Sequence, residues 1–387
     1  MKYNFEERRS RANMGSYKWN AMGDQPEEVI PFSTADMELL SPPEIIEALK
    51  KVAEFGMWGY TWWDEKYSDA MCHWLKTRHG WEIDPSWIVQ LNGVVQGLYA
   101  GVRAFSEPGD KILINTPVYG PFYRAINLNN RVVVENELVL RDGRYEIDFE
   151  DFEEKAKTAK IFILCSPHNP VGRVWTAEEL KRMGDICNKY NVLVFADEIH
   201  YDFVMPGYKH ICYATLGEEY AENSITFNAA SKTFSLAGLC VGNAIVSNKN
   251  IREPFDLEVN VSGCYTYSIF GNQALVTAYT ECSQWVDEVI QHVFDNYTYF
   301  KNYMNKHHPE IWVADMEGTY LAWFDCRCFG MESKELGEFL EKEAQLFFDH
   351  GYIFGSAGDG FERINLACPK KDLENALQRF TAAVSKL

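Results

Sequence analysis

The middle of the chain alternates short apolar runs with longer amphipathic stretches. Apolar runs of this length, bounded by turn residues, are typical of buried strands. Four of them stand out: 111–115 (KILIN), 160–165 (KIFILC), 191–196 (NVLVFA) and 224–228 (SITFN). Between the second and third runs, Thr176 and Glu179 have the spacing of a capping box, which predicts the start of a helix. Strands separated by helices indicate an α/β fold with a mostly parallel sheet covered on both faces.

The pattern changes after about residue 285. A long helical pattern comes first, and two strands follow near 320–325 and 361–366. A chain of 387 residues also exceeds the usual size of a single hydrophobic core. We therefore expect two domains, a large ligand-binding domain at 50–285 and a smaller α+β domain made of 1–49 together with 286–387.

Polar residues follow each of the four predicted strands, at the edge where parallel sheets bind their ligands. They include Tyr119, Asn169, Asp197 and Lys232, one after each strand. Beside a buried strand the amine of Lys232 would be partly desolvated, which favours the neutral form that attacks an aldehyde. Asp197 would need a cation or strong hydrogen bonds, and a protonated pyridine nitrogen is one such cation. A surface lysine in a loop and a carboxylate that caps the next helix are the alternatives at these two positions.

Further segments could complete a site for a phosphorylated cofactor and its substrate. Asn169 lies in a loop stiffened by two prolines, so its amide could reach a ring oxygen, and Tyr119 could stack on a ring face. The glycine turn at 92–97 precedes a helical pattern, whose first N–H groups could hold a phosphate. Arg363, on an alternating strand, could bind a carboxylate through two hydrogen bonds. A turn residue, a core aromatic side chain and a surface salt bridge are the alternative interpretations of these residues.

Composition narrows the range of partners. Apolar residues make up 47% of the chain, and 56 acidic residues against 37 basic ones give a net charge of −19. This surplus argues against nucleic acid or an anionic membrane as the main partner. The N-terminal residues lack the apolar stretch of a secretory signal, and no run of 18 apolar residues occurs. We therefore expect a soluble, cytoplasmic protein.

Motifs of other cofactor classes are missing from the sequence. Neither a G-x-G-x-x-G turn after a strand nor a G-x-x-x-x-G-K-[ST] loop is present, which argues against a dehydrogenase or a P-loop enzyme. The ten cysteines contain no Cys-x-x-Cys pair. Cys326 and Cys328 are the two cysteines nearest each other in the sequence, and they would point to opposite faces if they lay on a strand. We therefore expect reduced thiols and no metal site.

The order of these residues, with Tyr60 ahead of them, resembles that of the fold-type I pyridoxal-phosphate (PLP) enzymes, the aspartate aminotransferase superfamily, over essentially the whole chain. Several phrases are similar to one branch, the MalY/PatB group of C–S lyases, which includes cystathionine β-lyases and cystalysin-type cysteine desulfhydrases. These phrases are 35–37 (ADM), 58–60 (WGY), 93–95 (GVV), 166–172 (SPHNPVG), 197–200 (DEIH) and 231–234 (SKTF). The stretch 354–366 resembles the cystalysin type in particular.

The resemblance implies a fold, a cofactor and a role for each residue. The fold would be a fold-type I PLP transferase, with a mostly parallel seven-stranded sheet in an αβα sandwich and a smaller α+β domain. Lys232 would form the Schiff base to PLP, Asp197 would pair with the pyridine nitrogen, and Tyr119 would stack on the ring. The remaining roles would be contacts to the ring oxygen (Asn169), the phosphate (Val94, Val95, Ser231) and the substrate (Ala35, Asn169, Arg363), with His200 as a further cofactor-binding residue. Tyr60 would reach the phosphate of the neighbouring subunit, which requires a homodimer with shared active sites.

Two positions depart from the aminotransferase pattern. Three residues beyond Asp197, many aminotransferases have a tyrosine on the ring oxygen, whereas this chain has His200 with Tyr201 next. Eight residues beyond Lys232, they often have a phosphate-binding arginine, whereas this chain has Cys240. The phosphate would therefore depend more on backbone amides, hydroxyl groups and Tyr60.

The reaction implied by the resemblance is a β-elimination. Lys232 would remove the Cα proton of a cysteine-like substrate, a thiolate would leave from Cβ, and pyruvate and ammonia would follow. L-Cystathionine and L-cysteine are the expected substrates. An aminotransferase, which shares the first step, and a PLP-binding regulatory protein that acts through protein contacts are the alternatives.

Overall fold

The computed structural model describes residues 2–26, 29–62, 64–263 and 266–387. Its main sheet has seven strands in the order β1 (Ile88–Leu91), β9 (Gly242–Ile245), β8 (Ser224–Asn228), β7 (Leu193–Asp197), β6 (Ala159–Cys165), β2 (Lys111–Thr116) and β3 (Val132–Glu137). The five strands from β8 to β3 pair in parallel, and β9 pairs antiparallel with both β8 and β1. The predicted mostly parallel seven-stranded sheet and its four named strands are confirmed.

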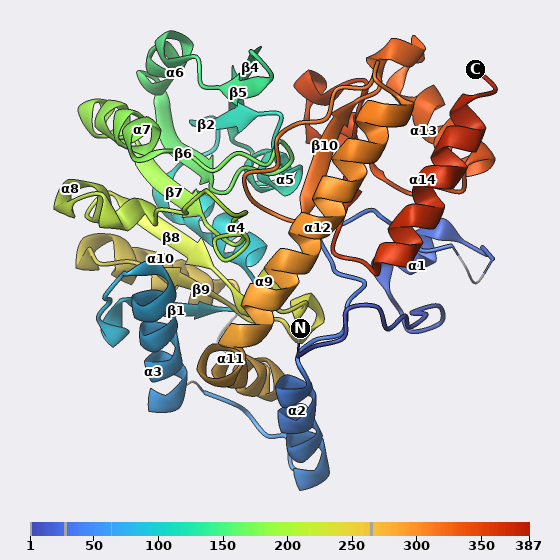
Figure 1. The fold of residues 1–387 in the computed structure, drawn as a ribbon. Coiled ribbons are helices and arrows are strands. Elements are labelled where there is room, and N and C mark those ends of the chain that lie inside the picture. The colour runs from blue at the N-terminus through green and yellow to red at the C-terminus, as the bar shows by residue number, and fades with distance from the viewer. Residues whose placement is uncertain (1, 27–28, 63, 264–265) are drawn as a thin grey trace.

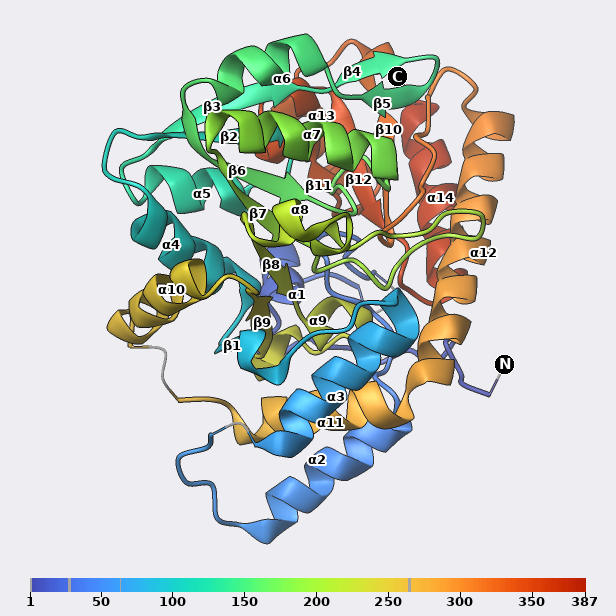
Figure 2. The same cartoon turned by 90° about the vertical axis from the view of Figure 1, so that its left-hand side faces the viewer.

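Apolar side chains alternate between the two faces of this sheet, so helices can cover both (Figures 1 and 2). On one face Ile114 and Phe195 belong to the same buried cluster as residues of α4 (Val94–Phe105), α5 (Pro121–Asn127) and α10 (Lys249–Val261). On the other, Leu113, Phe162 and Val194 pack with α6 (Phe149–Ala156) and α7 (Ala177–Tyr190). The sheet therefore forms the middle layer of an αβα sandwich.

The helix predicted after the second strand begins where the capping box placed it. The backbone N–H of Glu179 donates to Thr176 Oγ1 at 3.2 Å, and the N–H of Thr176 donates to Glu179 Oε2 at 2.8 Å. The same carboxylate accepts hydrogen bonds from Arg173 Nη2 at 2.8 Å. The start of α7 is thus fixed by its own cap and by the loop before it.

The C-terminal part of the chain builds a second, antiparallel sheet. Its strands are β10 (Leu321–Asp325), β12 (Phe361–Asn365) and β11 (Asp349–His350). The long helix α12 (Ser283–His307) crosses the molecule toward this sheet, beside α14 (Lys370–Val384), and α13 (Ser333–Glu343) lies at its end (Figure 1). The expected long helix and the two expected strands are present. The domain limits at 50 and 285 stay a prediction.

The remaining elements surround these two sheets. They are α1 (Tyr17–Met22), α2 (Pro43–Phe55), α3 (Glu65–Trp74) with a π-turn at Leu75–His79, the hairpin β4 (Val139–Arg141) and β5 (Arg144–Glu146), α8 (Glu218–Ala221), α9 (Ala230–Thr233) and α11 (Ile269–Glu281). Within the described residues, no helix is long and apolar enough to cross a membrane.

The N-terminal segment is tied to the C-terminal sheet. The N–H of Phe32 donates to Phe347 O at 3.0 Å, and the N–H of Asn365 donates to Phe32 O at 2.8 Å. Asn365 Nδ2 also donates to Thr34 O at 2.7 Å and to Asp36 O at 2.9 Å. Residues 32–36 therefore lie between β12 and the rest of the molecule.

Cys326 and Cys328 follow the strand predicted near 320–325 and are not on it. β10 ends at Asp325, whose carboxylate accepts the N–H of Arg327 at 2.9 Å, and a short 3₁₀ helix follows. Cys326 is buried and Cys328 is exposed. The nine cysteines in the described part of the chain are free thiols; the tenth, Cys264, lies outside it.

Candidate active site

A cavity of about 170 Å³ lies where the carboxyl ends of β6 and β7 meet the starts of α4 and α9. Most of the predicted site residues line it: Ala35, Val94, Val95, Tyr119, Asn169, Asp197, His200, Ser231 and Lys232. They come from distant parts of the sequence, and the edge of the parallel sheet brings them together. Two predicted residues are not in its lining, Arg363 and Tyr60.

Lys232 lies in the single turn of α9, directly after β8. Its amine donates to the backbone oxygen of Ala35 at 2.7 Å, and the phenol of Tyr320 donates to the same oxygen at 3.0 Å. Burial lowers the pKa of Lys232 to about 8, against the opposing effect of the Asp36 carboxylate. About a tenth of this amine is therefore neutral at pH 7, far more than at its ordinary pKa, and the neutral form is the one that acts as a nucleophile or a base.

Asp197 is the last residue of β7 and is buried. Its carboxylate accepts one backbone hydrogen bond, from Ile199 N at 3.2 Å. Burial raises the pKa of Asp197 to about 7, although that hydrogen bond and the charge of Lys232 act in the opposite direction. A buried carboxyl group in this state would be stabilised by a cation placed in the cavity.

Tyr119 and Asn169 line the same cavity. Burial raises the pKa of Tyr119 to about 12, with the charge of Asp197 as the second cause, so its phenol stays protonated. Its ring meets that of Phe122 edge to face, with centroids 5.9 Å apart. Asn169 is buried, and its side-chain oxygen accepts Arg363 Nη1 at 2.6 Å. Its amide NH₂ group is thus the part available to a ligand.

Arg363, on β12 of the C-terminal sheet, contacts Asn169 of the cavity lining. Besides Asn169, it forms an ion pair with Asp349, and its guanidinium lies 4.7 Å from the ring centroid of Phe354. Asp349 also accepts the N–H of Thr34 at 2.6 Å. The guanidinium is therefore held on two sides, although its own Nε is buried without a partner.

The first turn of α4 offers an anion site. Val94 and Val95 are its first two residues, and the N-cap, Gly93, has an extended backbone. A Cβ atom on Gly242 would come within 3.1 Å of Val94 N, so only glycine lets β9 approach this turn. Unpaired N–H groups and the helix dipole attract a phosphate here. Cys240, at the same cavity, is exposed.

His200 lines the cavity, whereas its neighbour Tyr201 does not. His200 is buried, burial lowers its pKa well below its ordinary range, and its Nδ1 has no partner. Tyr201 instead bonds through its hydroxyl to Tyr279 at 2.9 Å. The neutral imidazole, not the tyrosine, is therefore the side chain of this pair that can contact a bound ring.

Tyr60 is 98% exposed, so this chain alone does not use it in its own cavity. Exposed Met57, Trp58 and Trp62 are near it in the sequence. A broad exposed aromatic segment is typical of an interface between subunits. The predicted contact of Tyr60 with a neighbouring site stays a prediction.

Three residues at the site were missed. Cys165, the last residue of β6, lines the cavity, and burial raises the pKa of its thiol; its place at the end of the run 160–165 was the available signal. Tyr320 and Asp349 act through Ala35 and Arg363. No signal in the sequence singles out either one. The contact of Tyr320 with Ala35 joins residues 285 positions apart, and Asp349 lies on a strand of two residues.

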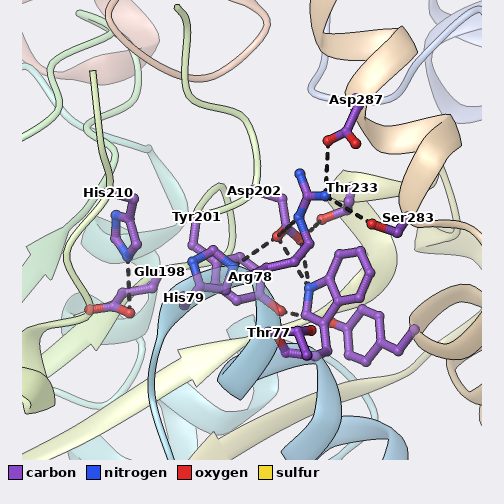
Figure 3. A network of polar contacts seen from close by, with 12 residues as sticks. Thr77, Arg78, His79, Glu198, Tyr201, Asp202, His210, Thr233, Ser283 and Asp287 are labelled. Carbon is purple, nitrogen blue, oxygen red and sulfur yellow. Dashed lines mark hydrogen bonds and ion pairs between the residues drawn. The ribbon is translucent and has the colours of Figure 1, made fainter. Parts of the chain in front are cut away.

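Among the described residues, one group of possible metal ligands lies together, Glu198, His210 and Cys212. Both carboxylate oxygens of Glu198 are already engaged, one by His210 Nε2 at 3.2 Å and the other by the N–H of Tyr213 at 2.6 Å. Figure 3 shows the Glu198–His210 pair beside a larger polar network. The pair joins the end of β7 to the segment before residue 213.

Comparison with known proteins gives one family. The model of the family "Aminotransferase class I and II" matches residues 27–380. Cystathionine beta-lyase PatB of Bacillus subtilis is 36% identical over 99% of this chain and 100% of its own length. The structure of cystalysin from Treponema denticola, which contains PLP, is 42% identical, covers 100% of both chains and superposes with a TM-score of 0.97. An aspartate aminotransferase of Pyrococcus horikoshii is 25% identical over 92% of this chain and 91% of its own.

Proposed function

The chain belongs to the class I and II aminotransferase family, and we propose that it is a PLP-dependent C–S β-lyase. Its substrates would be L-cystathionine and L-cysteine-type amino acids, cleaved to pyruvate, ammonia and a thiol. PLP is the cofactor, and the fold is that of the fold-type I enzymes. The observation that carries the proposal is the 42% identity to cystalysin over the whole chain, against 25% to an aspartate aminotransferase.

The residues of the cavity fit PLP at three points. The Asp197 carboxyl group has a raised pKa and lacks a cationic partner other than Lys232, so a protonated pyridine nitrogen would stabilise its charge. The first turn of α4 lines the cavity through Val94 and Val95, so its N–H groups can bind a phosphate there. Lys232 lines the same cavity, and burial lowers the pKa of its amine to about 8.

We assign the roles from these positions. Bound PLP supplies an aldehyde for covalent attachment and an electron sink for the substrate. Lys232 provides the amine to which the cofactor is joined, and Asp197 keeps the ring nitrogen protonated. Tyr119 packs against the ring, Asn169 and His200 face its oxygen, and the phosphate binds to Val94 N, Val95 N and Ser231.

The substrate is held by its carboxylate. Arg363 and the amide of Asn169 bind this group, and the backbone of Ala35 borders it. When its amine is not joined to PLP, Lys232 would accept the Cα proton of the substrate. The electron pair left on the substrate would then expel a thiolate from Cβ, and reaction of the remaining fragment with water would yield pyruvate and ammonia.

The substrate class is tested by product analysis. The purified protein with PLP should release pyruvate from both L-cystathionine and L-cysteine, with sulfide from the latter. The alternative is an aminotransferase, because the family includes such enzymes and both reactions begin with loss of the same proton. If amino-group transfer to 2-oxoglutarate were fast while pyruvate release was absent, the lyase proposal would be wrong.

The role of Asp197 predicts how stability depends on pH. Because its folded pKa is about 7, well above the ordinary value, the PLP-free protein binds more protons than the unfolded chain between about pH 4 and pH 7. Its free energy of unfolding should therefore fall as pH rises through this range, by up to roughly 4 kcal/mol. Chemical denaturation at several pH values measures this. The Asp197→Asn variant should lack this contribution to the slope, and bound PLP should reduce it; an unchanged slope in the variant would contradict the raised pKa.

We also propose a homodimer in which Tyr60 serves the cavity of the neighbouring subunit. The support is the almost complete exposure of this side chain and its aromatic neighbours. In a mixed dimer of Tyr60→Phe and Lys232→Ala subunits, one cavity would carry both defects and the other would regain both native groups. Subunit exchange, followed by mass, should therefore restore part of the activity. If activity stayed at the average of the two parents despite exchange, Tyr60 would serve its own subunit.

A further inference from the structure

A buried carboxylate lies behind the lysine of the proposed active site. The side chain of Asp202 is fully enclosed, and four groups surround it (Figure 3). Thr233 Oγ1 donates to Asp202 Oδ2 at 2.6 Å, Trp74 Nε1 donates at 3.2 Å, and His79 Nε2 lies 2.9 Å from Oδ1. A buried carboxylate is costly unless its oxygens are bonded in this way, so the arrangement around it is strongly favoured.

Thr233 is the residue after Lys232 and the last residue of α9. A helix of one turn has no intrinsic stability, so contacts outside it must set its direction. The chain leaves the helix at once, since Phe234 is no longer helical and Ser235 has a φ of 59°. The short bond from Thr233 to Asp202 is such a contact, and it fixes the last residue of α9.

Two bonds from neighbouring residues hold this segment. The amine of Lys232, which lines the cavity, donates to the backbone oxygen of Ala35. The hydroxyl of the next residue, Thr233, is buried and donates to Asp202. Because adjacent helical residues point about 100° apart, a rotation of this single turn would strain both bonds.

The network also extends to the long helix. The Nε atom of Arg78 lies 3.9 Å from Asp202 Oδ1. Its Nη1 donates hydrogen bonds to Asp287 at 2.9 Å and to Ser283 at 3.1 Å. Both partners belong to the first turns of α12. Trp74 lies under the guanidinium, 5.2 Å from it, and stacks on Tyr279 with centroids 4.7 Å apart. Asp202 is thus held by Trp74 of α3 and, through Arg78, by the start of α12.

We propose that Asp202 is a positioning residue that, through the hydroxyl of Thr233, sets the direction of the Lys232 amine. This inference rests on the role proposed for Lys232 and goes beyond it. Neither residue touches the cavity, because neither is in its lining. Their effect is expected on the step that the lysine performs, not on binding of the substrate carboxylate by Arg363.

Replacing the hydroxyl tests the inference in the PLP-bound protein. Thr233→Val keeps the shape and removes the donor, so kcat should fall by about 10- to 100-fold, as a small misplacement of a reacting group does, while KM changes little. The pH at which the visible absorbance of the bound cofactor titrates should shift as well. Thr233→Ser restores the hydroxyl and should recover most of both. Thr215→Val is the matched control, because that hydroxyl bonds only to a backbone oxygen, at 2.7 Å from Cys212 O.

Three results would overturn the proposal. They are a kcat of Thr233→Val within twofold of the native value, a Ser variant as impaired as the Val variant, or a control as impaired as either. If Thr233→Val did not fold, Asp202→Asn would be measured in its place. The same fall in kcat is expected, and a kcat within twofold of the native value would again overturn the proposal. If Lys232→Ala lost turnover while both variants kept it, only the positioning inference would fail. If Lys232→Ala kept its turnover, the proposed function would fail first.

Discussion

Lys232→Ala is expected to lower kcat by about 10⁴-fold or more, because it removes a covalent attachment point and a base at once. PLP should still bind, since Asp197 and the first turn of α4 are unchanged. Borohydride should fix the cofactor covalently to the native protein and not to the variant. Peptide mapping of the reduced native protein should find the pyridoxyl group on Lys232.

Lys111→Ala is the matched control, because that lysine is at the exposed start of β2 and contacts only Thr158, at 3.4 Å. Its activity should equal that of the native protein. A Lys232→Ala variant with full turnover, or a pyridoxyl group on another lysine, would disprove the assignment of the site.

Arg363→Ala is expected to lower kcat/KM by roughly 2–4 kcal/mol in transition-state binding, the range of a charge-assisted pair. Cofactor affinity should barely change, because the guanidinium contacts Asn169 and Asp349 and none of the residues proposed to hold PLP except that amide. Arg363→Lys should recover only part of the loss, because an ammonium cannot make two parallel bonds to a carboxylate.

The change also leaves Asp349 without its ion-pair partner in a largely buried place. The double variant Arg363→Ala with Asp349→Asn separates this effect from lost substrate binding, since it removes the unpaired charge. Arg327→Ala is the control, because that arginine bonds Asp325 at the exposed end of β10. If cofactor affinity collapsed while kcat/KM stayed normal, Arg363 would not bind the substrate.

The sequence predicts the centre of the fold well because burial leaves a clear local pattern there. Strands β2, β6, β7 and β8 are buried over nearly their whole lengths and carry apolar runs, and polar residues follow these runs. Position after such a strand is enough to bring Asn169, Asp197 and Lys232 together, since all parallel strands end at one edge. A capping box marks the start of α7 for the same local reason.

The parts that could not be predicted depend on contacts between distant segments. Strand β9 has four residues and runs antiparallel, and nothing local distinguishes it from a loop. Asp349, Tyr320 and Asp202 matter through contacts to residues elsewhere in the chain, and an isolated Asp or Tyr gives no pattern.

The bonds between Thr34, Asp36 and Asn365 have a consequence for the order in which the protein folds. Asn365 bonds the backbone oxygens of Thr34 and Asp36 across 331 and 329 residues of sequence. Ala35, whose oxygen accepts a hydrogen bond from the Lys232 amine, is therefore fixed only after β12 has been synthesised and has packed beside this loop. The parallel strands lie within residues 111–228, so their sheet can form earlier. We therefore expect nascent chains stalled before β12 to capture PLP poorly and chains that contain β12 to acquire it.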